Sequence, residues 1–92
     1  MSEKAIKIRV KGRVQGVFYR ANTKDKALEL NLKGWVKNDP DGAVSIHAEG
    51  AEENLLKLME WCKKGPNLSR VDSLDYNWCD KTDCLTSFEI KY

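Results

Sequence analysis

The sequence is poor in the side chains that most often hold metals or attack substrates. It contains one histidine, three cysteines and two prolines in 92 residues. The histidine, His47, is far from any pair of cysteines, so a structural zinc site is not expected. The longest apolar runs cover only a few residues, which excludes a membrane-spanning helix. A net charge of +2 is too small to indicate a broad nucleic-acid surface. We therefore expect no metal, no cofactor, and neither nucleic acid nor membrane as a partner.

The composition is that of one compact domain, which we expect to span residues 1–92. Hydrophobic residues make up 41% of the chain and charged residues 33%, a balance typical of globular proteins. The first ten residues, MSEKAIKIRV, are charged and lack the apolar core of a signal peptide, so we expect a cytoplasmic protein. That compartment favours free thiols at Cys62, Cys79 and Cys84. Cys79 and Cys84 remain candidates for a disulfide if their Cα atoms lie within about 7 Å.

Hydrophobic periodicity divides the chain into strands and helices. Four segments alternate apolar and polar side chains and are expected to form strands, at residues 5–11, 43–50, 70–79 and 87–92. A short strand at Trp35 and Val36 precedes a turn rich in Asn, Asp, Pro and Gly at residues 38–42. Helices are expected at residues 21–31 and 51–64. The second of these has the clearer apolar face, made by Leu55, Leu58, Met59 and Cys62.

The order of these elements, β-α-β-β-α-β with a short last strand, restricts the fold. Strands with one apolar face indicate a largely antiparallel sheet that is covered on one side. Right-handed crossovers place both helices on that side. We therefore predict an α+β fold, a ferredoxin-like split β-α-β sandwich with two helices on one face. The alternation in the segment 43–50 points His47 away from the core, and we expect a solvated surface histidine.

One segment punctuated by glycines, GRVQGVFYR at residues 12–20, contains no acid, cysteine or histidine. In the predicted fold it leads into the first helix, whose N-terminus has unpaired N–H groups and a positive dipole end. Gly12 and Gly16 allow a tight turn and the close approach of a ligand. The guanidinium of Arg20 can bind two oxygens of one phosphate. These features fit a cradle for a dianion, although the spacing alone equally suits an ordinary strand-to-helix turn.

The same segment resembles the first signature of the acylphosphatase family, which usually has Phe where this chain has Tyr19. A second segment, GWVKN at residues 34–38, resembles that family's second signature and is followed by Gly42, Val44 and Gly50. The resemblance covers nearly the whole chain. It implies that Arg20 and Asn38 are the catalytic residues. It also implies that the substrate's phosphate is bound by a continuous run of backbone amides, those of Gln15, Gly16, Val17, Phe18, Tyr19 and Arg20.

The chemistry of the implied reaction suits these residues. An acylphosphatase hydrolyses the carboxyl–phosphate bond of a small acyl phosphate to a carboxylate and inorganic phosphate, without a metal. The leaving carboxylate belongs to an acid with a pKa of about 4, so it needs no general acid. Charge in the transition state lies on the phosphoryl oxygens, where amides and Arg20 would stabilise it. Asn38 would orient the attacking water without adding negative charge. The resemblance suggests that the substrate's phosphate accepts the proton of that water.

Two alternative functions remain compatible with the sequence. The same cradle would serve a non-catalytic module that binds phosphate or carbamoyl phosphate. A binder of single-stranded RNA on the open sheet face is disfavoured by the near-neutral charge and the missing aromatic ribonucleoprotein motifs. Asn38 also suits the start of the turn at residues 38–42, where Asn is common. We expect a monomer whose partner is a small acyl phosphate.

Overall fold

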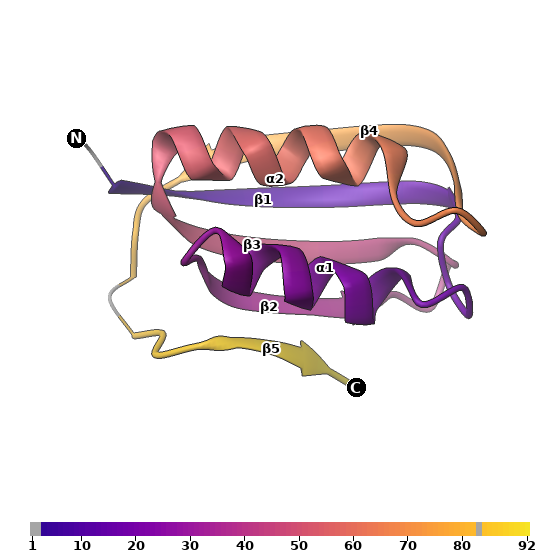
Figure 1. Cartoon of the computed structure of the whole chain (residues 1–92), viewed down its shortest axis with the longest axis horizontal. Coiled ribbons are helices and arrows are strands. Elements are labelled where there is room, and N and C mark those ends of the chain that lie inside the picture. Colours follow the sequence, from indigo (N-terminus) through magenta and orange to yellow (C-terminus); the bar gives the residue numbers. More distant parts are fainter. Residues whose placement is uncertain (1–2, 83) are drawn as a thin grey trace.

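The computed structural model describes residues 3–82 and 84–92, which form five strands and two helices (Figure 1). The elements follow in the predicted order: β1 (Glu3–Arg13), α1 (Tyr19–Glu29), β2 (Lys33–Asn38), β3 (Val44–Ala51), α2 (Glu52–Lys64), β4 (Arg70–Cys79) and β5 (Phe88–Lys91). Pairing with β3 and β4 continues β1 beyond its alternating segment at both ends. Neither α1 nor α2 is long and apolar enough to cross a bilayer, and no other helix occurs among the described residues.

The five strands form one sheet in the order β4-β1-β3-β2-β5. β3 lies between β1 and β2 and is antiparallel to both, while β4 pairs with the other side of β1. β5 joins the far edge of the sheet, parallel to β2. The alternation within β5 does not show which edge this strand joins. Both helices pack on one face of the sheet, α2 on β1, β3 and β4, and α1 on β2 and β5 (Figure 1). The predicted split β-α-β sandwich is confirmed.

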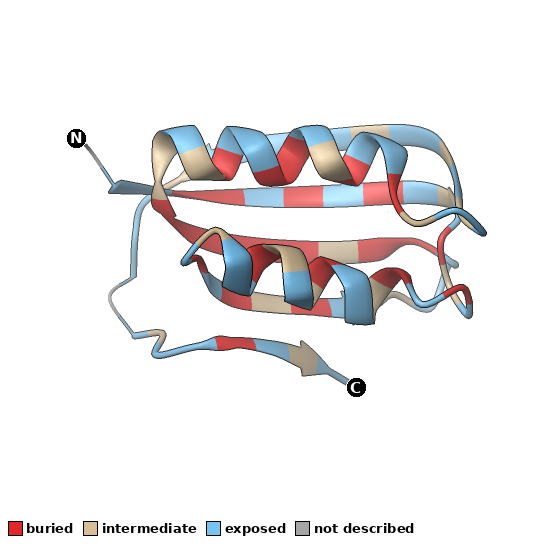
Figure 2. Ribbon diagram, in the orientation of Figure 1, coloured by how far each residue is buried: buried red, intermediate tan, exposed pale blue. Residues whose placement is uncertain are grey.

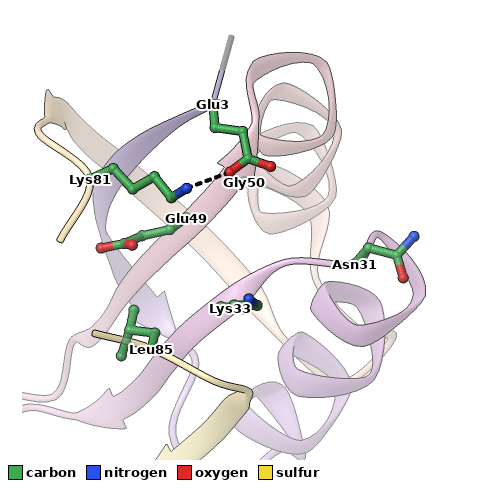
Figure 3. A pocket seen from close by; sticks show the side chains of 7 residues that line it. All are labelled: Glu3, Asn31, Lys33, Glu49, Gly50, Lys81 and Leu85. Atoms are coloured by element: carbon green, nitrogen blue, oxygen red, sulfur yellow. Dashed lines mark hydrogen bonds and ion pairs between the residues drawn. The ribbon is translucent and has the colours of Figure 1, made fainter. Parts of the chain in front are cut away.

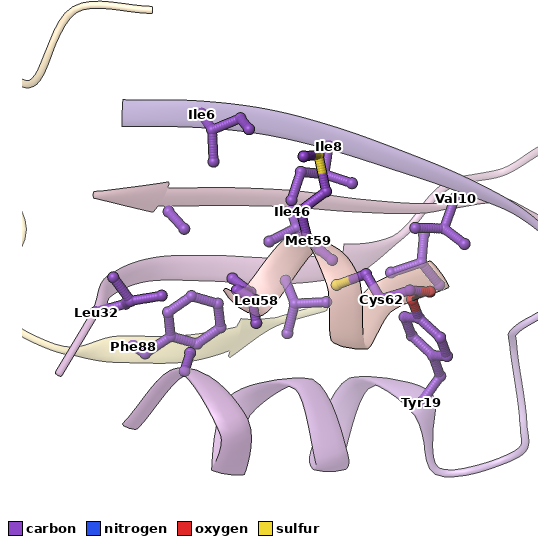
Figure 4. Close-up of a cluster of buried hydrophobic side chains, with 14 of the residues drawn as sticks. Ile6, Ile8, Val10, Tyr19, Leu32, Ile46, Leu58, Met59, Cys62 and Phe88 are labelled. Atoms are coloured by element: carbon purple, nitrogen blue, oxygen red, sulfur yellow. Dashed lines mark hydrogen bonds between the residues drawn. The ribbon is translucent and has the colours of Figure 1, made fainter. Parts of the chain in front are cut away.

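The hydrophobic core lies between the sheet and the two helices. Buried and exposed residues alternate along β1 (Figure 2), with Ile6, Ile8 and Val10 inside, as the periodicity predicted. The apolar face predicted for α2 is buried in full, at Leu55, Leu58, Met59 and Cys62. Figure 4 shows side chains of the sheet and of both helices meeting in a single cluster. Removal of this apolar surface from water is the main stabilising contribution to the fold.

Helix α1 begins and ends two residues earlier than the predicted segment 21–31. Its N-cap is Phe18, whose left-handed backbone (φ 64°, ψ 17°) turns the chain into the helix without a side-chain cap. Only a narrow stripe of α1 is buried, at Tyr19, Thr23 and Ala27. Because this stripe starts inside the glycine-punctuated segment and includes a threonine, the apolar pattern of the sequence placed the helix too late.

The prediction of a solvated surface for His47 is wrong. Its side chain is 8% exposed, and its Nε2 lies 2.8 Å from a carboxylate oxygen of Glu49. The imidazole also stacks on Trp35, with ring centres 5.8 Å apart. Thr82, in the connection from β4 to β5, donates its N–H and its O–H to the same Glu49 oxygen, at 3.1 and 2.8 Å. Alternation gives the face of a strand correctly, but it does not reveal that a distant segment covers that face.

The three cysteines are free thiols, as predicted: Cys62 is buried, Cys79 is half-buried and Cys84 is exposed. Burial raises the pKa of the Cys62 thiol to about 12, so this side chain packs as a small neutral group. The segment between Cys79 and Cys84 includes Asp83, which lies outside the described residues.

Candidate active site

The loop between β1 and α1 owes its conformation to glycine at two positions. At Gly12 the register between β1 and β4 shifts, and a Cβ there would lie 2.1 Å from the carbonyl oxygen of Arg70. Gly16 has open space around it but adopts a φ of 74°, which side chains other than glycine rarely tolerate. Phe18 is also left-handed, at a φ of 64°. Left-handed residues interspersed along a loop are the conformation that turns successive N–H groups toward an anion.

The backbone amides of this loop are free to bind a ligand. Within residues 3–82 and 84–92, no N–H group from residue 15 to residue 21 donates to a backbone acceptor. Helix α1 has no acidic residue in its first turn and no side-chain cap, so the positive end of its dipole is not neutralised locally. Backbone donors are rarely left without any partner, so water or a ligand is expected to meet them. The loop therefore offers a run of donors to an anion.

Arg20 stands beside these amides, half-buried in the first turn of α1. Its guanidinium carbon lies 5.1 Å from the centre of the Tyr92 ring, a distance typical of cation–π contacts. None of the ion pairs among the described residues involves Arg20. Next to it is a hollow of about 160 Å³, lined by Val14, Gly16, Phe18, Tyr19, Arg20, Ala21, Ile90 and Tyr92. A guanidinium without a carboxylate partner at such a hollow is well suited to bind a phosphate.

Val17 and Tyr19 contribute only their backbone to the loop, because their side chains face the core and are 6% and 1% exposed. The Tyr19 hydroxyl, the departure from the usual signature, donates a hydrogen bond of 2.7 Å to the carbonyl oxygen of Cys62. Cys62 lies near the end of α2, and Pro66, four residues later, has no N–H for that carbonyl. The hydroxyl therefore satisfies an acceptor that the helix end leaves open, and the loop is not disturbed.

Asn38 ends β2 on the face that the helices cover, two residues after the buried Val36. Its partner across the ladder is Val44, which on its other side pairs with Val10 of β1. The side-chain oxygen of Asn38, Oδ1, is buried and has no hydrogen-bond partner in the part of the chain that the structure describes. Buried polar atoms nearly always have a partner. This oxygen therefore marks a place where water or a ligand binds.

Strand direction brings the loop and Asn38 to the same end of the molecule. β1 and β2 are both antiparallel to β3, so their C-terminal ends lie at the same end of the sheet (Figure 1). That end of the sheet carries the loop 14–18 after β1 and the turn 39–43 after β2. The two are joined by Gln15, whose Nε2 donates to the carbonyl oxygens of Asp39 at 2.8 Å and Ala43 at 2.9 Å. The predicted amides and Asn38 thus lie at the same end of the sheet, whereas the residues that line the hollow beside Arg20 do not include Asn38.

Sequence patterns did not indicate the Gln15 side-chain contacts or the lining residues Ile90 and Tyr92. The two partners of Gln15 are 24 and 28 residues away along the chain, and no local pattern marks a bond of that kind. Ile90 and Tyr92 reach the loop only because β5 joins the edge beside β2. The alternation of β5 showed that they share a face, but it did not show which helix end they approach.

The carboxylates of the turn 39–43 are neutralised away from the loop. Arg9 of β1 places its Nε 3.5 Å from the Asp39 carboxylate, and its Nη2 pairs with Asp41. The hydroxyl of Ser45 also donates to Asp39. The N–H of Ala43 and the Arg9 guanidinium hold the pKa of the Asp41 carboxyl below its usual value. These contacts lie toward the open face of the sheet, so the negative charge does not oppose an anion at the loop.

A second hollow, at the opposite end of the sheet, is a weaker candidate for a phosphate site (Figure 3). It has a volume of about 100 Å³ and is lined by Glu3, Asn31, Lys33, Glu49, Gly50, Lys81 and Leu85. Lys81 pairs with Glu3 at 2.6 Å. Two acidic and two basic side chains balance there, so this hollow has no excess of positive charge with which to attract a dianion.

The fold and the loop define a class of small α+β sandwich proteins whose first strand-to-helix connection is shaped for an oxyanion. The family model for acylphosphatase matches residues 6–90 of the chain, which includes both signature segments. The chain belongs to the acylphosphatase family, as its resemblance to the two signatures predicted.

Individual relatives agree with this assignment over nearly the full length. An acylphosphatase of Methylococcus capsulatus is 47% identical over 87 residues, which cover 95% of each chain. The crystal structure of the acylphosphatase from Bacillus subtilis superposes with a TM-score of 0.93 at 37% identity, and covers 97% of this chain and 99% of that one. An acylphosphatase from Coxiella burnetii has a TM-score of 0.92 at 36% identity, with 97% and 93% covered.

Proposed function

We propose that the protein hydrolyses the carboxyl–phosphate bond of small acyl phosphates, and that Arg20 and Asn38 are its catalytic residues. Membership of the acylphosphatase family supports the reaction. The observation that carries the assignment of the site is the buried Oδ1 of Asn38, which has no partner among the described residues. It lies at the same end of the sheet as the unpaired loop amides. The hydrolysis of a phosphate anhydride needs donors for the phosphoryl oxygens and an acceptor that orients a water, and this end of the sheet offers both.

The loop and Arg20 hold the phosphoryl group in this proposal. The N–H groups of residues 15–20 and the positive end of α1 supply donors that are already in place before the substrate arrives. Arg20 adds a planar charged fork that binds two phosphoryl oxygens. Because charge is spread over those oxygens in the transition state, the same donors lower the barrier of the reaction.

Asn38 orients the attacking water. Its Oδ1 accepts a hydrogen bond from the water, whose oxygen then bonds to phosphorus as the bond between phosphorus and the carboxylate oxygen breaks. The water proton passes to an oxygen of the phosphate, and the carboxylate leaves as an anion. A neutral amide suits this task because a carboxylate at this position would repel the dianion. No side chain of the enzyme has to form a covalent intermediate.

The proposal is tested by the hydrolysis of acetyl phosphate in the presence of a chelator, with release of inorganic phosphate as the readout. We expect the unmodified protein to be active. Asn38→Ala should lose about 100-fold in kcat while binding inorganic phosphate as before, because it removes the water ligand and leaves the loop intact. Arg20→Ala should lose both phosphate binding and kcat/KM, by at least about tenfold.

Two surface variants serve as controls. Arg70→Ala removes an arginine on β4 whose side chain is 72% exposed, and Asn67→Ala removes an exposed asparagine after α2. Neither should change activity. Wild-type kcat in Asn38→Ala would contradict the proposed mechanism. Tight binding of phosphate with no turnover by the unmodified protein would favour the alternative, a non-catalytic module for phosphate or carbamoyl phosphate.

We also propose that the protein acts as a cytoplasmic monomer. The first ten residues, which are charged and lack the apolar core of a signal peptide, are the ground for the compartment, and the free thiols of Cys79 and Cys84 are compatible with it.

A further inference from the structure

The side chain of Gln15 joins the loop 14–18 to the turn 39–43. Its Nε2 donates two hydrogen bonds, at 2.8 Å to the carbonyl oxygen of Asp39 and at 2.9 Å to that of Ala43. Among the hydrogen bonds of the described residues, these two are the ones that connect the loop to the turn. The contact is partly buried, so water competes with it less than it would at an exposed site.

The turn is shaped to receive this one carboxamide. The Ala43 carbonyl oxygen already accepts from the Asp39 N–H at 2.8 Å, and the Asp39 carbonyl oxygen already accepts from the Gly42 N–H at 3.1 Å. A carbonyl oxygen has two lone pairs, and a carboxamide nitrogen has two hydrogens. Gln15 therefore gives each carbonyl oxygen its second hydrogen bond and uses both of its own donors. With its donors occupied, the Gln15 side chain is not available to bind a phosphate.

The position of the turn matters because Asn38 immediately precedes it. The peptide bond between Asn38 and Asp39 supplies the N–H that donates to the Ala43 carbonyl oxygen. That oxygen is also one of the two acceptors of Gln15, so Gln15 contacts the backbone directly after Asn38. On the open face, Arg9 and Ser45 bind the Asp39 side chain. Those contacts fix the turn to the sheet, whereas Gln15 fixes it to the loop that carries the unpaired amides.

We infer that Gln15 is a positioning residue for the reaction: its carboxamide holds Asn38 at the correct distance and angle from the anion-binding loop. The inference rests on the proposed function, since it assigns Gln15 a role only through Asn38. An in-line attack tolerates little displacement, and a shift of about 1 Å in a positioned group can cost about 100-fold in rate. Phosphate binding depends on the loop amides and Arg20, which Gln15 does not contact through its side chain.

The first test replaces Gln15 by a side chain of similar length that cannot donate. Gln15→Met should lower kcat for acetyl phosphate by about 10- to 100-fold and leave KM and the Kd for inorganic phosphate within about twofold of the wild type. An equal loss in phosphate affinity would contradict the inference, because it would show that the substitution damages the cradle itself. Thermal unfolding of each variant checks that it is folded at the assay temperature.

The second test is a double-mutant cycle with Asn38→Ala, because residues that act as one unit give non-additive effects. If Gln15 acts through Asn38, Gln15→Met should change kcat by less than about twofold in the Asn38→Ala background. Multiplicative losses would overturn the inference and leave the proposed function in place. Wild-type kcat in Asn38→Ala alone would overturn both.

The third test uses Gln15→Glu, which keeps the size of the side chain. A carboxylate cannot donate to the two carbonyl oxygens and is repelled by them, whereas a protonated carboxyl donates one hydrogen bond. The neighbouring titratable groups on the turn, Asp39 and Asp41, both pair with Arg9 and are the same in every variant. Repulsion by the two carbonyl oxygens and partial burial place the pKa of the introduced Glu above the ordinary value of about 4.3. The ratio of Gln15→Glu to wild-type kcat should therefore rise as the pH is lowered from neutral, while the ratio for Gln15→Met stays constant. Parallel pH profiles for the two variants would contradict a role through these hydrogen bonds.

Discussion

Tyr19 shows how one atom beyond the usual signature is accommodated. Its ring occupies a fully buried position, and the added hydroxyl meets the carbonyl oxygen of Cys62 at 2.7 Å. Burial raises the pKa of Tyr19 far above its ordinary value, and the neighbouring Cys62 adds to that effect. The hydroxyl is therefore a neutral donor at neutral pH. The extra oxygen ties the start of α1 to the end of α2.

We expect Tyr19→Phe to lower the free energy of unfolding by about 1–2 kcal/mol, because it leaves a buried carbonyl without its donor. Since the hydroxyl points away from the loop, kcat and KM should not change. Urea unfolding and steady-state kinetics measure the two effects separately. Tyr76→Phe is the matched control, because Tyr76 is 48% exposed and should show neither effect. A loss of activity in Tyr19→Phe would show that the ring positions the loop through its hydroxyl.

At the scale of elements, the carboxylate of Glu49 helps to hold the connection from β4 to β5. Glu49 accepts hydrogen bonds from the N–H and the O–H of Thr82 and lies against His47. Burial alone would raise the pKa of Glu49, but the hydrogen bonds from His47 and Thr82 outweigh it, and the pKa lies below its ordinary value. This connection leads into β5, which brings Ile90 and Tyr92 to the hollow beside Arg20.

A carboxyl group whose pKa is lower in the folded than in the unfolded protein stabilises the fold above its unfolded pKa, and this stabilisation is lost as the pH falls through the folded pKa. We therefore expect Glu49→Gln to be less stable than the wild type at pH 7 by roughly 1–3 kcal/mol. The difference should shrink below about pH 4.5, near the ordinary value for Glu. Urea unfolding from neutral to acidic pH measures it. The same substitution at the exposed Glu89 of β5 is the control and should be neutral. A difference independent of pH would show that Glu49 contributes by packing and not by charge.

At the scale of the whole molecule, the proposed site depends on folding, because its parts come from β1, α1, β2 and β5. A ligand that binds this assembled site binds the folded state and not the unfolded chain. Such a ligand stabilises the protein by about 2.7 kcal/mol at about 100 times its Kd. For a chain of this size, each kcal/mol corresponds to a shift in Tm of about 4–8 °C.

We therefore expect inorganic phosphate at saturating concentration to raise Tm by about 10–20 °C. Asn38→Ala should show the same rise, because it keeps the loop and Arg20, whereas Arg20→Ala should show little of it. Sodium chloride at matched ionic strength is the control for general salt effects, and thermal unfolding followed by circular dichroism is the measurement. An undiminished rise in Arg20→Ala would place the phosphate elsewhere on the protein.

The fold could be predicted from the sequence because most elements have their own periodicity. Period-2 alternation marked β1 and β3, and an apolar stripe marked α2. The glycines and the arginine of residues 12–20 also indicated an anion-binding loop. Prediction was weaker for α1, whose buried stripe is narrow and begins at Tyr19, because local pattern does not reveal where a left-handed N-cap starts a helix.

The sequence by itself determined which residues face the core, the order of the elements and the presence of two signature segments, since these follow from neighbours along the chain. Only the tertiary structure decided that His47 is covered, that β5 joins β2, and that Gln15 reaches the turn after Asn38. The physical reason is that local periodicity indicates only the backbone conformation of one segment and which of its side chains share a face. Contacts between distant segments depend on how the finished layers meet, and they are formed only when the whole chain has folded.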